Sequence, residues 1–161
     1  MLQQVCDYIH NYFISKDNGV PRVWQGNYTI ASGVISPAPP LKEGQRFMII
    51  GSDLNDGIYT YYADAIMNDD DKVAAELRDE VFSGSIAAMS VPIAIMNAIV
   101  EGLAWREQHA SAMNGQYNSE NVSGVYSYTI SPQITEALNH PLGLPAYITN
   151  QFERWRKPCP M

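Results

Sequence analysis

The stretch LKEGQRFMIIGSDLNDGIYTYYAD, residues 41 to 64, predicts a two-stranded hairpin. Phe47 to Ile50 is an apolar run rich in β-forming residues, and Ile58 to Tyr62 is a second one. Between them, Asn55-Asp56-Gly57 supplies residue types that tolerate positive φ, as hairpin turns require. Helical patterns lie on both sides, so this stretch predicts a compact β-module placed between helices.

Other β-type runs extend this module in both directions. Short strands are expected at Val23-Trp24, at Tyr28 to Ile30 and, after the turn-like Ala31-Ser32-Gly33, at Val34-Ile35. Asn68 to Asp71 predicts the cap and acidic first turn of a short helix with Val73, Leu77 and Val81 facing inward. Phe82 to Met89 then predicts a last strand, whose small residues would allow close approach to a neighbouring backbone.

Helices are expected at both ends of the chain. Apolar residues from Leu2 to Phe13 recur at helical spacing, in a helix that stops before Asn18-Gly19. A long helix is expected after a cap at Ser90, with Pro92 in its first turn, ending near Met113. Its apolar stripe (Ile95, Met96, Ile99, Val100, Leu103, Trp105) is wider than one partner helix needs. A final helix is expected from about Ala146 to Lys157.

These elements predict an α+β fold. The expected core is a small bundle of the N-terminal, central and C-terminal helices, with an inserted β-barrel-like or hairpin module and an extended loop-strand. The expected domains are a helical part, residues 1–18 and 90–161, with the extended loop at 114–131, and an inserted β-rich part, residues 19–89. Between Gly115 and Ser131, a polar loop leads into Val125 to Ile130, which alternates like a strand and is suited to pairing with a neighbouring molecule's sheet edge.

Composition limits the function classes. Ten Lys and Arg against seventeen Asp and Glu give a formal net charge of −7, which disfavours tight binding to nucleic acid or anionic membrane. The N-terminus lacks the pattern of a signal peptide and no run reaches the length of a membrane span, so we expect a protein made in the cytoplasm. Cys6 and Cys159 are the only cysteines and predict neither a disulfide framework nor a thiolate metal site.

No catalytic, cofactor-binding or metal-binding motif is present, and we expect a chain that is not an enzyme. His10, His109 and His140 lie in different segments without metal-ligand spacing. The Asp69-Asp70-Asp71 run lacks the glycine and distant glutamate of a calcium loop. A small hydrolase whose site is built from dispersed residues stays open as an alternative.

Several segments in order along the chain carry a family resemblance. They are Leu41 to Gln45, Ile50 to Tyr59, Glu80 to Gly84, Ala88 to Pro92 and Ser123 to Thr129. Together they resemble the head–tail connector proteins (adaptor or neck proteins) of tailed bacteriophages and prophages, over nearly the whole chain. The sequence departs from this resemblance at His140 to Pro145 and in the Pro158-Cys159-Pro160 tail.

The resemblance implies a virion structural protein at the neck, assembled in the host cytoplasm. Such adaptors form a ring, by resemblance a dodecamer, beneath the portal protein, and join it to a head-closure or tail-completion protein. Genomic DNA would pass through the lumen as a non-specific passenger, and no cofactor or membrane is implied. A head-closure or tail-completion protein, further from the capsid, is the alternative within the neck.

Two segments are expected to supply subunit and partner contacts. The loop-strand would form contacts between copies, and the last helix would dock on the portal, because aromatic and Arg side chains are frequent in protein interfaces. The candidate interface residues are Tyr117, Val125, Tyr126, Tyr128, Ile130, Phe152, Arg154, Trp155, Arg156 and Lys157.

Overall fold

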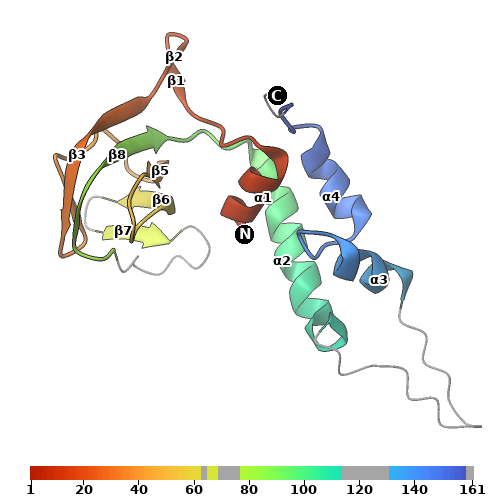
Figure 1. Ribbon diagram of the computed structural model, residues 1–161. Helices are drawn as coiled ribbons and strands as arrows, with labels where there is room; N and C mark the ends of the chain where they lie inside the picture. Colours follow the sequence, from red (N-terminus) through yellow and green to blue (C-terminus); the bar gives the residue numbers. More distant parts are fainter. Residues whose placement is uncertain (63–64, 69–76, 114–130, 159–161) are drawn as a thin grey trace, which may run out of the picture. The chain divides into compact units, whose positions relative to one another are not determined.

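The computed structural model describes residues 1–62, 65–68, 77–113 and 131–158 (Figure 1). The fold is α+β, as the sequence predicts. The chain divides into two compact units. The sheet unit comprises Met1–Gln3 and Tyr12–Pro92, and the helical unit comprises Gln4–Asn11 and Ile93–Met161.

The sheet unit is built on an antiparallel, curled sheet with the strand order β4-β3-β8-β5-β6-β7 (Figure 1). The two-residue strands β1 and β2 form a separate small hairpin. The strands are β1 (Lys16–Asp17), β2 (Val20–Pro21), β3 (Val23–Ala31), β4 (Val34–Ser36), β5 (Arg46–Ile50), β6 (Gly57–Tyr62), β7 (Ala65–Asn68) and β8 (Glu80–Ala88).

The hairpin predicted from residues 41–64 is β5–β6, with Met48 opposite Ile58. Its connection is a loop and not the tight turn that the sequence indicated. Positive φ occurs at Gly51 (87°) at the start of the loop, and none of Asn55, Asp56 and Gly57 has it. The loop is instead held by side-chain hydrogen bonds, described below.

The remaining strands differ from the prediction in three places. The runs at Val23 and Tyr28 are one continuous strand, because β8 pairs with β3 residue by residue from Val23↔Ala87 to Ile30↔Glu80. Val81 lies in β8 and not on the inner face of a helix; the rest of that predicted helix falls mainly on residues 69–76, outside the described residues. Strand β7 was not predicted.

The core of the sheet unit lies on the inner face of this sheet. In the C-terminal half of β3, alternate residues (Tyr28 and Ile30) are buried, as expected for a half-buried strand. Buried members of the cluster are Tyr28, Ile30, Ile35, Phe47, Ile49, Leu77, Phe82 and Ile86. Tyr28 and Phe82, on paired strands, stack with ring centroids 5.5 Å apart.

Helix α1 (Leu2–Ile9) is shorter than the sequence predicted. His10 and Phe13 have φ of 52° and 49°, left-handed values that end a right-handed helix. Residues 12–18, which we expected in the helical part, belong to the sheet unit. The reason is pairing: Ile14 bridges Met89, and the Ser15 N–H donates to the Ala88 carbonyl at 2.8 Å.

The helical unit contains most of α1 together with three later helices, of which α2 packs against both others. These are α2 (Ile93–Met113), α3 (Pro132–Asn139) and α4 (Ala146–Glu153). Helix α2 begins at Ile93, so Ser90 is not adjacent to its first turn and Pro92 precedes it. Helix α3 was not predicted: Ser131 caps it by accepting from the Ile134 N–H, and Pro132 occupies the first turn.

Candidate interaction surfaces

The structure separates the ten predicted interface residues into three groups. Tyr117, Val125, Tyr126, Tyr128 and Ile130 lie outside the described residues. Phe152 is fully buried in α4, so its side chain packs inside the helical unit and offers no surface to a partner. Arg154, Arg156 and Lys157 are exposed and Trp155 is half-buried, beyond the end of α4 at Glu153 rather than within it.

The chain after α4 is fixed to the end of α1. The Lys157 N–H donates to the Ile9 carbonyl at 3.0 Å, and the Asn11 side-chain amide donates to the Trp155 carbonyl at 3.0 Å. The Arg154 guanidinium lies 5.5 Å from the centre of the Trp155 ring. The basic cluster of the sequence is therefore an ordered corner of the helical unit.

A polar cluster beside this corner joins α1 to α3 and α4. The Tyr8 hydroxyl donates to Glu153 Oε1 at 2.5 Å and lies 3.2 Å from His140 Nε2. Arg156 forms an ion pair with Glu153 (2.8 Å) and covers the Tyr8 ring at 4.5 Å. Because the Leu142 N–H donates to His140 Nδ1, the ring proton of neutral His140 lies on Nε2 and points to the Tyr8 oxygen.

This cluster brings together residues that are dispersed along the sequence. Burial raises the pKa of Tyr8 above its ordinary value, and the hydrogen bond and charge of Glu153 raise it further, against the opposing charge of Arg156. The arrangement keeps Tyr8 protonated, which suits a structural tie between helices.

A second polar network holds the loop between β5 and β6. The Ser52 hydroxyl donates to Glu80 Oε2 at 2.5 Å, and the side-chain amide of buried Asn55 donates to the same oxygen at 2.8 Å. The Asp53 N–H donates to Glu80 Oε1 at 2.8 Å. These bonds lower the pKa of Glu80, and the bond from Ser52 has the largest effect. The carboxylate is therefore charged, and both of its oxygens accept hydrogen bonds.

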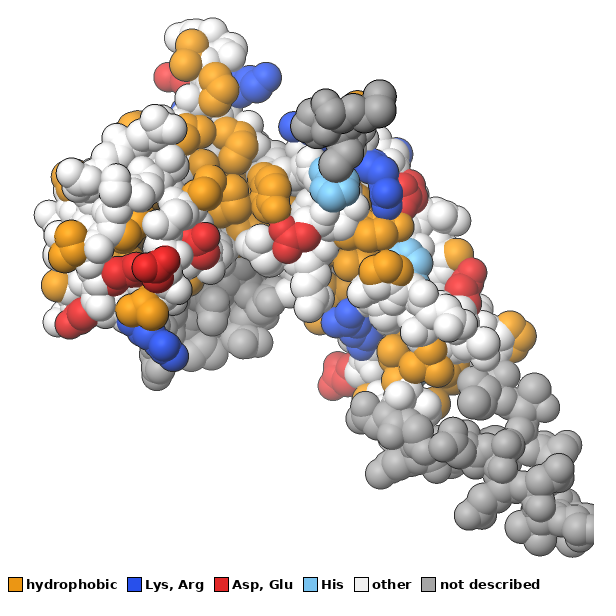
Figure 2. Space-filling model, in the orientation of Figure 1, with side chains coloured by type: hydrophobic (Ala, Val, Ile, Leu, Met, Phe, Trp, Pro, Cys, Tyr) orange, Lys and Arg blue, Asp and Glu red, His pale blue; other side chains and the backbone are white. Residues whose placement is uncertain are grey.

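Helix α2 carries apolar side chains on its solvent side. Ile93, Val100 and Leu103 are 74%, 63% and 42% exposed. At 100° per residue, Ile93 and Val100 lie on one stripe and Leu103 borders it. The predicted apolar stripe of this helix also contains three buried residues, Ile95, Ile99 and Trp105. The stripe therefore divides into a buried part and an exposed part. Figure 2 shows hydrophobic side chains at the surface of both units.

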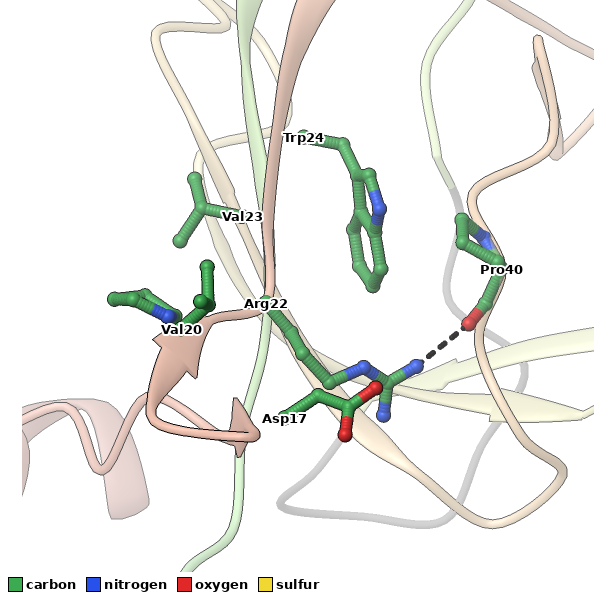
Figure 3. A pocket seen from close by; sticks show the side chains of 7 residues that line it. Asp17, Val20, Arg22, Val23, Trp24 and Pro40 are labelled. Atoms are coloured by element: carbon green, nitrogen blue, oxygen red, sulfur yellow. Dashed lines mark hydrogen bonds between the residues drawn. The ribbon is translucent and has the colours of Figure 1, made fainter.

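An open pocket of about 440 Å³ lies where β2 leads into β3. In Figure 3 the Trp24 ring stands between β3 and Pro40, and the Arg22 guanidinium donates to the Pro40 carbonyl at 2.8 Å. The guanidinium carbon also lies 5.4 Å from the centre of the Trp24 ring. The lining is therefore mixed: apolar side chains lie beside the Arg22 guanidinium and the Asp17 carboxylate, and its exposed surface is about equally polar and apolar.

Two further properties concern only the described part of the chain. No group of three or more His, Cys, Asp or Glu side chains there is arranged to hold a metal ion. None of its helices combines the length and the apolar character needed to cross a bilayer.

The sequence did not indicate the Tyr8 cluster or the Trp24 pocket. Tyr8 lies 132 positions from His140 and 145 from Glu153, so no local spacing could reveal their cluster. The Trp24 pocket depends on Pro40, which the sequence indicated only as a break in pairing. Comparison with known proteins found no matching family model, no matching curated protein and no matching solved structure.

Proposed function

We propose that the chain is a structural subunit of the neck of a tailed bacteriophage, a head–tail adaptor that assembles as a ring beneath the portal protein. The observation that carries the proposal is the ordered series of resembling segments from Leu41 to Thr129. Segments of this kind without catalytic residues suit a protein that works by assembly.

Subunit contacts in a ring are heterologous, so each copy must carry two different surfaces that fit each other. The exposed stripe of α2, Ile93 and Val100 with Leu103 at its border, supports one such surface, because an apolar stripe of this kind is a usual mark of a protein interface. The ordered corner at Arg154 to Lys157 supports a second contact, with the portal, through exposed cations beside a half-buried Trp155.

The charge of the chain suits a conduit for DNA. A net charge of −7 leaves the ring without the phosphate-neutralising surface that would hold DNA by counterion release. Like charges repel over about 10 Å at ordinary ionic strength, so DNA would slide rather than adhere. Binding of duplex DNA to the isolated protein at physiological salt would contradict this part of the proposal.

Mass photometry tests the function directly. The chain is measured alone and with the portal protein of the same phage, and we expect rings or ring-loaded portals. An adaptor binds the portal without any third component, whereas a head-closure or tail-completion protein binds only after the adaptor is present. A chain that is monomeric when measured alone and does not bind the portal when mixed with it would refute an adaptor.

The docking corner has a matched pair of variants. Arg154→Ala with Lys157→Ala removes two exposed cations next to Trp155 and is expected to weaken portal binding. Lys16→Ala with Lys42→Ala removes the same charge from exposed positions of the sheet unit and is expected to leave portal binding unchanged. Equal effects of the two pairs would assign the loss to net charge and not to the corner.

A further inference from the structure

Strand β3 has an outer edge that its own sheet leaves uncovered. On one side, β8 pairs with β3 from Val23 to Ile30. On the other side, β4 pairs only with Thr29, Ile30 and Ala31. The edge from Val23 to Tyr28, here called the β3 edge, therefore lacks a neighbouring strand in the described part of the chain.

The backbone groups on the β3 edge can be assigned by alternation. The Ala88 N–H donates to the Arg22 carbonyl at 2.9 Å, so Arg22 faces β8. Hydrogen-bonding direction alternates along an antiparallel strand, so Val23, Gln25 and Asn27 direct their N–H and C=O groups outward. Across the described residues, no backbone hydrogen bond reaches these three positions.

The β3 edge also lacks the features that keep edge strands from pairing. Natural edges carry Lys, Pro, a bulge or a covering segment. Val23 to Tyr28 reads Val-Trp-Gln-Gly-Asn-Tyr, without charge or proline, and Gln25, Gly26 and Asn27 are exposed. At its Val23 end lies the Trp24 pocket of about 440 Å³. Backbone pairing with an adjacent side-chain pocket is the arrangement by which sheets bind extended peptides.

We propose that the β3 edge of one copy receives residues 125–130 of a second copy as an added strand. This inference rests on the proposed ring, for which it supplies a subunit contact. The donor segment, Val-Tyr-Ser-Tyr-Thr-Ile, is uncharged, as is the edge, and rich in β-forming residues. A strand and an edge are two different surfaces, so donation from copy to copy is heterologous and propagates around a ring.

The donor follows a long linker and carries side chains suited to the edge. The eleven residues 114–124 between α2 and the donor can span about 35 Å when extended. In a strand, Tyr126, Tyr128 and Ile130 would share one face, and a tyrosine, with an apolar ring and a polar hydroxyl, suits the mixed lining of the Trp24 pocket. Arg22 and Asp17 at that pocket offer partners to a phenolic hydroxyl.

Complementation between two variants tests the inference. The edge variant, Gln25→Lys with Asn27→Lys, adds charge to exposed positions of the β3 edge and keeps the donor. The strand variant, Tyr126→Pro with Tyr128→Pro, removes two donor N–H groups and keeps the edge. The control, Val81→Lys with Ser83→Lys, adds the same charge to exposed positions of β8, which pair with β3 on the side away from the β3 edge.

Sedimentation velocity on the full chain gives the readout. We expect the wild type and the control to assemble, each test variant to associate at least tenfold more weakly, and an equimolar mixture of the two to form a two-chain species that neither forms alone. A labelled peptide of residues 124–131 is expected to bind the strand variant and not a variant that combines all four test substitutions.

The contrary outcomes separate this inference from the function on which it rests. An edge variant that assembles like the wild type overturns strand donation and leaves the adaptor standing. A mixture that stays monomeric overturns donation between copies, since the strand then pairs within its own chain. A wild type that stays monomeric with and without the portal overturns both.

Discussion

Gly84 sets the distance between two strands of the sheet. A Cβ at this position would overlap the Ile50 carbonyl oxygen and lie 3.0 Å from the Phe82 ring. The sequence predicted that small residues in this strand would allow close backbone approach, and Gly84 confirms it. The Ile50 carbonyl belongs to backbone, so it cannot move aside as the end of a flexible side chain would.

We therefore expect Gly84→Ala to lower the free energy of unfolding by about 1–3 kcal/mol, the usual cost of overpacking. Gly26→Ala is the control, because its Cβ would meet the Tyr28 ring at an ordinary 4.0 Å. Urea unfolding followed by circular dichroism compares them. Equal midpoints for the two variants would show that the strands can separate at no cost.

Glu80 makes the stability of the sheet unit depend on pH. Its pKa is lowered in the folded state by the bonds from Ser52, Asp53 and Asn55. A lowered folded pKa contributes stability above the ordinary value of 4.5, and this contribution is lost as the pH falls through the folded pKa. Glu80→Gln should therefore be less stable than the wild type at pH 6, and the difference should shrink below pH 4.5.

Unfolding midpoints in urea between pH 6 and pH 3 measure this effect. Glu43→Gln, the same change at an exposed residue, serves as the control. If the stability difference between Glu80→Gln and the wild type stays constant down to pH 3, the charge of Glu80 does not contribute to holding the loop.

At the scale of elements, Tyr8 ties α1 to the helices that follow α2. Tyr8→Phe removes the bonds to Glu153 and His140 but keeps the ring under Arg156. We expect a loss of about 0.5–1.5 kcal/mol, and faster amide exchange in α1. Tyr147→Phe removes an exposed hydroxyl from α4 and should change neither measurement. Unchanged exchange in α1 for Tyr8→Phe would contradict the tie.

The sequence predicts those elements whose pattern is local. The β5 and β6 runs and the turn at Ser32-Gly33 (φ 50° and 77°) are confirmed, because turn residues and alternation act over a few positions. Helix α1 stops at Ile9 although its apolar spacing continues, because residues 12–18 pair with the sheet unit instead. Tertiary pairing overrides local pattern there, and spacing alone cannot show it.

The elements that the sequence missed are short ones. Helix α3 spans eight residues and carries only Ile134 and Ala137 as buried positions, too few to give a periodic signal. Ser131 followed by Pro132 is a capping signal that could have located its start. The sequence predicts Phe152 as part of a docking helix, but its spacing from Ile148 places both on the buried face of α4.

At the scale of the whole molecule, the α2 stripe is expected to serve assembly. Val100→Asp with Leu103→Asp places charge on this surface and should raise the concentration needed for ring formation by at least tenfold, with little effect on folding. Leu138→Asp, at a residue of α3 that is 52% exposed, is the control and should assemble normally. Sedimentation velocity over a range of concentrations distinguishes them, and normal rings from the α2 variant would exclude the stripe as a contact.

In the proposed ring, the two units carry different contact surfaces. The helical unit carries the α2 stripe and the Arg154 to Lys157 corner, and the sheet unit carries the β3 edge. An assembly protein needs separate surfaces for its own copies and for other proteins. Both units contribute, so neither is expected to form rings alone.

A cryo-electron microscopy reconstruction of the intact virion neck tests the central claim most directly. The account predicts a ring of this chain in contact with the portal, with α2 at a subunit boundary. A neck in which another protein occupies that position and this chain is absent would contradict it.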